Sequence, residues 1–218
     1  MCLLNLETSR MAIKNIIFDL GGVIIDLERN RAINALEKLG VSEAGTLLGE
    51  YSQKGIFFFL ETGQTSSSDF YDLILPQCRP GTSCSDIRDA FEEFLLDLPL
   101  ARLKLVESLR EKGFKLYVLS NTNPIMFNHW IARAFQQDGK TINDYFDGIV
   151  ASFQEGVCKP EAAIFEKIIL RYNLKPEETL FLDDSSANIN EAKNMGLNGY
   201  LVTPDQDIVN LDFDKLTL

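Results

Sequence analysis

Six polar residues stand where short apolar runs of this sequence end or where a helix begins, and their types suit phosphoryl chemistry. They are Asp19, Ser120, Asn121, Lys159, Asp183 and Asp184. An aspartate carboxylate can attack phosphorus and form a covalent aspartyl-phosphate, which makes Asp19 the candidate nucleophile. Attack on an anionic phosphoryl group requires that the charge repulsion be offset. The sequence therefore predicts a cation close to Asp19.

Magnesium suits this requirement because Mg²⁺ favours hard oxygen ligands and is typically bound through one or two carboxylates together with substrate oxygens. We expect its ligands to be the carboxylates of Asp184 and Asp183, one oxygen of Asp19 and the backbone carbonyl near Gly21. Mg²⁺ is the expected cofactor.

The other candidates would bind the phosphoryl group. Lys159 adds a positive charge near the nucleophile, and Ser120 with the amides after it, including Asn121, can donate hydrogen bonds to phosphoryl oxygens. Gly21 and Gly22 let the backbone pass close to a ligand and adopt unusual φ values. Lys159 is the expected second catalytic residue beside Asp19, because a cation at the start of a helix is disfavoured by the helix dipole and so needs another reason to be there.

Five short and nearly continuous apolar runs are typical of strands that are buried on both faces of a parallel sheet. They lie at residues 15–19, 115–120, 147–152, 179–184 and 199–203. Runs with helical spacing follow at 101–112, 162–172 and 188–195. This alternation predicts the α/β class, with a Rossmann-like doubly wound parallel sheet. The ligand crevice of such a sheet lies at the carboxyl ends of its strands, where the polar residues should converge.

The alternation stops between residues 28 and 97, where helix-like stretches at 32–39, 66–75 and 87–96 predict an inserted helical cap. We expect an N-terminal extension at 1–12, a core domain at 13–27 and 98–218, and a cap domain at 28–97. The three phenylalanines at 57–59 fit a cap core better than a sugar-stacking surface. The polar loop at 61–65 is a candidate to hang over the crevice and contact the substrate.

Composition narrows the class of protein. The formal net charge of −11 argues against a general nucleic-acid binder, which would show a basic face. It does not exclude an anionic small substrate, since a metal ion and one lysine can reverse the local field. Four scattered cysteines fit free thiols in a reducing cytoplasm, and no apolar run is long enough to span a bilayer. We expect the partner to be a small phosphorylated metabolite, with neither nucleic acid nor membrane involved.

Four segments in order resemble the signature motifs of the haloacid dehalogenase (HAD) superfamily. They are FDLGGV at 18–23, LSNTN at 119–123, CKPE at 158–161 and LDDSSAN at 182–188. The resemblance extends over about 13–202, and the helical insert lies where that superfamily has its C1 cap. The chain is most similar to the branch with bacterial α-D-glucose-1-phosphate phosphatases and the N-terminal phosphatase domain of soluble epoxide hydrolase.

The resemblance assigns roles to residues of this sequence. It implies that Asp19 is the nucleophile, that Ser120 and Asn121 bind phosphate, and that Lys159 stabilises charge. It also implies a Mg²⁺ site at Asp19, Asp184 and Asp183.

One position departs from the superfamily pattern. Most of its phosphatases carry a second Asp two residues after the nucleophile as general acid and base, and here that position is Gly21. General acid catalysis is typically worth roughly 10²–10⁴-fold. One interpretation is a substrate with a better leaving group, such as a sugar-1-phosphate. A second is dehalogenation, which needs no proton, although the pair Asp183 and Asp184 argues against it. A third is a catalytically weak protein that binds a phosphometabolite or a partner.

Overall fold

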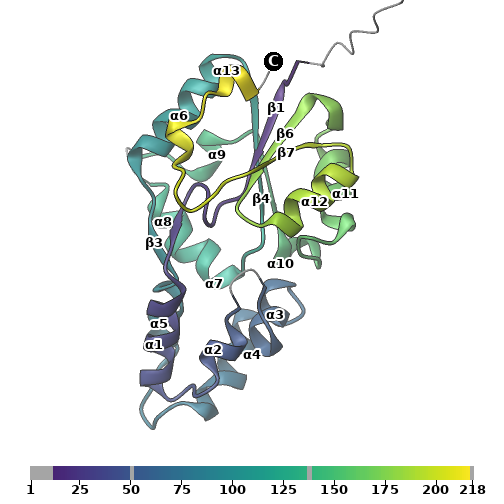
Figure 1. Cartoon of the computed structure of the whole chain (residues 1–218). Coiled ribbons are helices and arrows are strands. Elements are labelled where there is room, and N and C mark those ends of the chain that lie inside the picture. Colours follow the sequence, from purple (N-terminus) through teal and green to yellow (C-terminus); the bar gives the residue numbers. More distant parts are fainter. Residues whose placement is uncertain (1–11, 50–51, 137–138, 217–218) are drawn as a thin grey trace, which may run out of the picture.

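The computed structural model describes residues 12–49, 52–136 and 139–216, so the predicted N-terminal extension lies outside the described residues except for Ala12. Its centre is a five-stranded sheet in the order β5-β4-β1-β6-β7, in which every neighbouring pair is parallel (Figure 1). The strands are β1 (Asn15–Phe18), β4 (Lys115–Ser120), β5 (Gly148–Ala151), β6 (Thr179–Asp183) and β7 (Asn198–Leu201). All five correspond to predicted runs. The run at 147–152 is shorter than expected, because Ser152 already begins a helix.

Alternating side chains of the strands pack into two hydrophobic layers, one on each face of the sheet. Ile16 and Phe18 of β1 belong to one layer, which includes Val106 of α6 (Leu100–Glu111). Ile17 belongs to the other, together with Ile168 of α11 (Ala162–Arg171). This two-sided packing is the doubly wound α/β arrangement that the sequence predicts.

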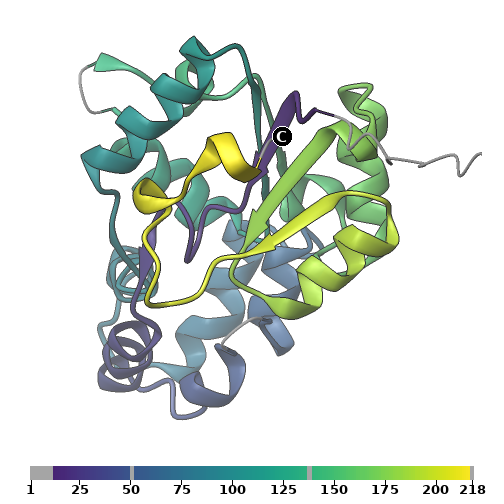
Figure 2. The same cartoon turned by 45° about the horizontal axis from the view of Figure 1, so that its top comes forward.

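Helices cover both faces of the sheet, as the two views show (Figures 1 and 2). Besides α6 and α11, the elements of this part are α7 (Pro124–Met126), the π-helix η2 (Phe127–Ile131), α8 (Ala132–Ala134), α9 (Ile142–Tyr145), α10 (Ser152–Glu155), η4 (Pro176–Glu178), α12 (Ser186–Asn194), η5 (Ile208–Asn210) and α13 (Phe213–Leu216). The elements α11 and α12 lie on one face, and α6 and α13 lie on the other.

The stretch after β1 forms the helical insert at the carboxyl end of the sheet (Figure 1). Its elements are α1 (Arg29–Leu39), α2 (Ala44–Leu47), α3 (Gly55–Glu61), α4 (Ser67–Ile74), η1 (Leu75–Gln77) and α5 (Cys84–Glu92). Phe57, Phe70 and Phe91 form its aromatic core, with ring centroids 4.9 to 6.0 Å apart. Phe57 is therefore a core residue of the insert, whereas Phe59 is 41% exposed.

The predicted helix at 87–96 is wrong at its carboxyl end. Helix α5 ends at Glu92, and β3 (Leu95–Asp97) pairs antiparallel with β2 (Asp26–Leu27). The backbone N–H of Glu28 extends this ladder by donating to the carbonyl of Phe94 at 2.9 Å. The two segments that connect the insert to the sheet thus form backbone hydrogen bonds with each other. The spacing of apolar residues within one segment does not reveal such a long-range pairing.

Candidate active site

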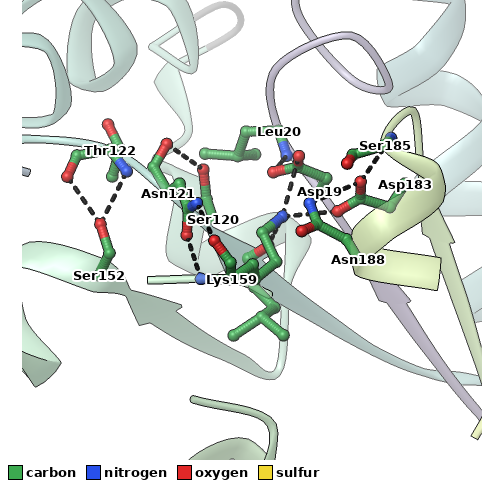
Figure 3. Close-up of polar contacts among 11 residues, drawn as sticks. Asp19, Leu20, Ser120, Asn121, Thr122, Ser152, Lys159, Asp183, Ser185 and Asn188 are labelled. Carbon is green, nitrogen blue, oxygen red and sulfur yellow. Dashed lines mark hydrogen bonds and ion pairs between the residues drawn. The ribbon is translucent and has the colours of Figure 1, made fainter. Parts of the chain in front are cut away.

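The carboxyl ends of β1, β4 and β6, which are neighbours in the sheet, bring the predicted residues together (Figure 3). Asp19 directly follows β1, Ser120 ends β4, and Asp183 ends β6. Strand register explains the convergence, because Phe18 is aligned with both Val118 and Leu182.

Lys159 reaches this edge from the loop before α11 and lies between two carboxylates (Figure 3). Its Nζ is 2.9 Å from Asp19 Oδ2 and 2.7 Å from Asp183 Oδ2, and it also donates to the carbonyl of Leu119 at 2.8 Å. Burial lowers the pKa of Lys159, but the two carboxylates outweigh it and hold that pKa above its usual value. The ammonium group is therefore charged at neutral pH.

Asn121 fixes the backbone of Lys159 with both ends of its side-chain amide. Asn121 Oδ1 accepts from the N–H of Lys159 at 2.7 Å, and Asn121 Nδ2 donates to the carbonyl of Lys159 at 2.9 Å. This positioning contact was not predicted from the sequence, and the phosphate contact expected of Asn121 stays a prediction. Ser120 is buried, and its Oγ lies 3.5 Å from the carbonyl of Asn121.

Asp183 is fully buried and its carboxylate accepts three hydrogen bonds. One oxygen accepts from Lys159 Nζ, and the other accepts from the N–H of Ser185 at 2.8 Å and from Asn188 Nδ2 at 2.9 Å. Asp184, in contrast, is only half-buried and faces the same pocket as Asp19. The neighbouring aspartates therefore differ in burial: Asp183 is enclosed by the protein, and Asp184 is partly exposed at the pocket.

Asp19, Asp183 and Asp184 each offer one carboxylate oxygen within 4.8 Å of the others. Burial raises the pKa of Asp19, and the two neighbouring carboxylates add to this, so that it reaches about 8 despite the lowering effect of Lys159. A divalent cation among these oxygens would favour their charged forms. Three hard oxygen donors with excess negative charge fit Mg²⁺.

Two glycines shape the loop after β1. Gly22 has a φ of 73°, and a Cβ atom there would lie 2.3 Å from Asp184 Oδ2, so this position needs glycine for its backbone conformation and for the close approach of Asp184. A Cβ at Gly21 would lie 2.9 Å from Leu27 Cδ1. Leu27 thus occupies the direction that a side chain at position 21 would take.

Two adjoining pockets lie between the insert and the carboxyl edge of the sheet, and both include Gly21, Gln53 and Glu61 in their walls. The nucleophile pocket contains Asp19, Lys159 and Asp184. The cap pocket contains Ser120, Thr122, Asn123, Phe91 and Met126.

Glu61 brings a carboxylate from the insert into both pockets. It is the last residue of α3 and is 6% exposed. Its carbonyl accepts a hydrogen bond from Ser152 Oγ of the core at 2.7 Å. Burial raises the pKa of Glu61 to about 7, while Lys159 and the backbone N–H of Gln53 lower it. The sequence placed Glu61 in a loop expected over the crevice but did not single out its carboxylate.

The sequence is similar to those of known hydrolases. The family model of haloacid dehalogenase-like hydrolases matches residues 13–196. A D-ribitol-5-phosphate phosphatase of Bacteroides thetaiotaomicron is 38% identical over 188 residues, which cover 86% of this chain and 91% of that protein. Rat bifunctional epoxide hydrolase 2 is 26% identical over 210 residues, covering 88% of this chain and 37% of that protein.

Solved structures agree with the sequence comparison. A HAD family enzyme from Bacteroides thetaiotaomicron, in complex with magnesium and inorganic phosphate, superimposes with a TM-score of 0.83 at 34% identity. The match covers 90% of this chain and 97% of that one. None of the described helices combines the length and the apolar character needed to cross a lipid bilayer.

Proposed function

Since the chain belongs to the haloacid dehalogenase-like hydrolase family, we propose that it is a Mg²⁺-dependent phosphatase that acts on a small phosphorylated sugar or sugar alcohol through an aspartyl-phosphate on Asp19. The observation that carries the proposal is the shared geometry of Asp19, Lys159 and Asp184 in one pocket. We further propose that residues 28–97 form a cap domain over a core of 13–27 and 98–218.

In this mechanism Asp19 is oriented for attack by two contacts. Its Oδ1 accepts from the N–H of Leu20 at 2.7 Å, and its Oδ2 pairs with Lys159. One carboxylate oxygen attacks phosphorus, the bond to the leaving oxygen breaks, and water later hydrolyses the aspartyl-phosphate. Lys159 offsets the charge of the phosphoryl group and of Asp19, and Ser120 and Asn121 donate to phosphoryl oxygens.

Asp19, Asp184 and the carbonyl of Gly21 would hold Mg²⁺, and Asp183 offers a further carboxylate oxygen within the same cluster. The bound ion supplies charge neutralisation between the carboxylates and the phosphoryl oxygens. Asp183 is already engaged with Lys159, Ser185 and Asn188, so we assign it mainly to orienting Lys159. Gly22 leaves room for Asp184 beside the backbone.

The pockets support a small hydroxylated leaving group. Gln53 Oε1 is buried and has no hydrogen-bond partner among the described residues, and a substrate hydroxyl would satisfy it. Thr122 and Asn123 add polar groups to the cap pocket. A phosphorylated sugar or sugar alcohol fits this mixed lining. The similarity to a D-ribitol-5-phosphate phosphatase supports the same class of substrate. The cluster of three carboxylates favours phosphoryl transfer over dehalogenation.

Turnover of p-nitrophenyl phosphate by purified protein, with and without Mg²⁺, tests the chemistry. We expect Mg²⁺-dependent release of nitrophenol by the wild type and none above background by Asp19→Asn. Equal rates for the two proteins would refute the assignment of Asp19. A panel of pentitol phosphates, sugar-5- and sugar-6-phosphates and sugar-1-phosphates then identifies the substrate class. If only sugar-1-phosphates are hydrolysed, this would support the interpretation that Gly21 is tolerated because the substrate has a better leaving group.

A further inference from the structure

A phosphatase that releases an ordinary alcohol needs a proton for the leaving oxygen, and Gly21 cannot supply one. Leu27 lies where a side chain at position 21 would point, so the usual acid is replaced by an apolar contact. Asp26, further along the same segment, is paired with Arg102 at 2.7 Å in the ladder that leads to the insert. The segment after β1 therefore provides no proton donor at the pocket.

Four side chains in the walls of the two pockets carry titratable groups: Asp19, Glu61, Lys159 and Asp184. Asp19 is the proposed nucleophile and Asp184 a proposed metal ligand. Lys159 is held charged by two carboxylates. Glu61 is the remaining titratable side chain of the two pockets, and its carboxyl group can both donate a proton and accept one.

We propose that Glu61, which the insert places in the same pocket as Asp19 and Gly21, is the general acid and base of this site. The inference rests on the proposed phosphatase function and extends it. Helix α3 carries Glu61 to the pocket, and the hydrogen bond from Ser152 to the Glu61 carbonyl ties the end of that helix to the core. At Gly63 a Cβ would lie only 2.1 Å from the carbonyl of Phe153, which shows how closely this part of the insert contacts the core.

The surroundings of Glu61 suit both protonation states. Burial raises the pKa of Glu61 to about 7, so the acid and the carboxylate are both populated near neutral pH. The charged and titratable groups facing it are Lys159, Asp19 and Asp184 across the nucleophile pocket and the thiol of Cys158, whose Sγ is 4.0 Å from Glu61 Oε2. Burial holds the pKa of Cys158 at about 12, so the thiol stays neutral.

The proton balance closes over two steps. When the carboxylate of Asp19 bonds to phosphorus, the bond from phosphorus to the leaving oxygen breaks, and that oxygen takes the proton of the Glu61 carboxyl group. The alcohol leaves and Glu61 is a carboxylate. In the second step Glu61 takes a proton from water as the water oxygen bonds to phosphorus. The bond between phosphorus and Asp19 breaks, which restores the Asp19 carboxylate and the neutral Glu61.

Glu61→Gln tests this role because it keeps the size of the side chain and removes the dissociable proton. On an alkyl phosphate we expect kcat to fall by roughly 10²–10⁴-fold. On p-nitrophenyl phosphate, whose leaving group needs no proton, the first step should remain near the wild-type rate while the second slows. Stopped-flow measurement should therefore show a burst of about one equivalent of nitrophenol per enzyme, followed by slow turnover.

Glu37→Gln is the matched control, since Glu37 is an exposed glutamate of the same insert. It should leave both rates at the wild-type level. Glu61→Asp, which retains a carboxyl group on a shorter chain, should keep more alkyl phosphatase activity than Glu61→Gln. Thermal unfolding and circular dichroism establish that the variants are folded.

Two results would overturn the inference while the proposed function stands. One is an alkyl phosphatase rate of Glu61→Gln within a few-fold of an Asp19-dependent wild type. The other is an equal loss of the nitrophenol burst rate and the alkyl phosphatase rate, which would mean that Glu61 only positions or binds. A wild type with no Asp19-dependent turnover would refute both the proposed function and the role of Glu61.

Discussion

Replacing Gly22 with alanine should weaken Mg²⁺ binding without unfolding the protein. The backbone there has a φ of 73°, which costs an L-residue about 1–2 kcal/mol. In addition the new Cβ would lie 2.3 Å from Asp184 Oδ2 and 2.6 Å from Asp184 Cγ, so this carboxylate has to move away. We expect the free energy of unfolding to fall by about 1–2 kcal/mol from the backbone term alone.

The effect on the metal site is separated from the backbone strain by a matched variant. Gly156 has a φ of 74°, and a Cβ there would have nothing within 4 Å, so Gly156→Ala carries the backbone strain without a steric clash. Urea unfolding should show a loss for both variants, and that of Gly22→Ala should be at least as large as that of Gly156→Ala. Calorimetric titration should show that only Gly22→Ala binds Mg²⁺ at least about tenfold more weakly, equivalent to 1.4 kcal/mol. Wild-type Mg²⁺ affinity in Gly22→Ala would refute Asp184 as a ligand held beside this glycine.

Three further outcomes are expected. Lys159→Met leaves the carboxylates of Asp19 and Asp183 buried without their cation, so urea unfolding at pH 7 should show a loss of about 3–5 kcal/mol. Gln53→Leu removes a buried acceptor that lacks a partner among the described residues, so it should raise the free energy of unfolding by about 1 kcal/mol. The same variant should raise KM for a polyol phosphate about tenfold and leave KM for p-nitrophenyl phosphate nearly unchanged. Between pH 4.5 and about 7 folded Glu61 keeps a proton that the unfolded chain releases, so stability should fall by about 3 kcal/mol as pH rises through this window. Glu61→Gln should lack this contribution.

Each of these outcomes has a result that contradicts it. A Lys159→Met protein as stable as the wild type would mean that the two carboxylates find other partners. An unchanged KM for polyol phosphates in Gln53→Leu would remove Gln53 from substrate binding. For Glu61, the stability difference between variant and wild type is measured at pH 5 and pH 8, and a difference that does not change with pH would contradict a raised pKa in the folded state.

The core and the convergence of the site residues could be predicted because local patterns determine them. A run such as 179–184 is typical of a buried strand, which the structure has at Thr179–Asp183, and parallel strands place their carboxyl ends at one edge. Asp19, Ser120 and Asp183 therefore come together whatever the details of the helices. The family match agrees with the motifs on which the resemblance was based.

The features that were not predicted all depend on contacts between segments distant in sequence. The ladder of β2 and β3 forms only when the two ends of the insert meet. The helical spacing at 87–96 therefore predicted a helix that extended into the residues of β3. Asn121 pairs with the backbone of Lys159, 38 residues away. Glu61 becomes buried because α3 docks on the core at Ser152; the sequence marked the loop at 61–65 as a candidate for substrate contact but did not indicate that this carboxylate would be buried.

The ladder between β2 and β3 also bears on how such proteins diversify. The chain departs from the sheet and comes back to it along two adjacent antiparallel strands, which pair at Asp26 with Asp97 and, after an irregularity, at Leu27 with Leu95. Everything between these strands could therefore be exchanged for a segment of different length without disturbing the sheet order, as domain insertions tolerate when their two ends lie close together. If the proton donor resides in that exchangeable part, substrate preference and acid catalysis would be inherited as one module, separate from the nucleophile.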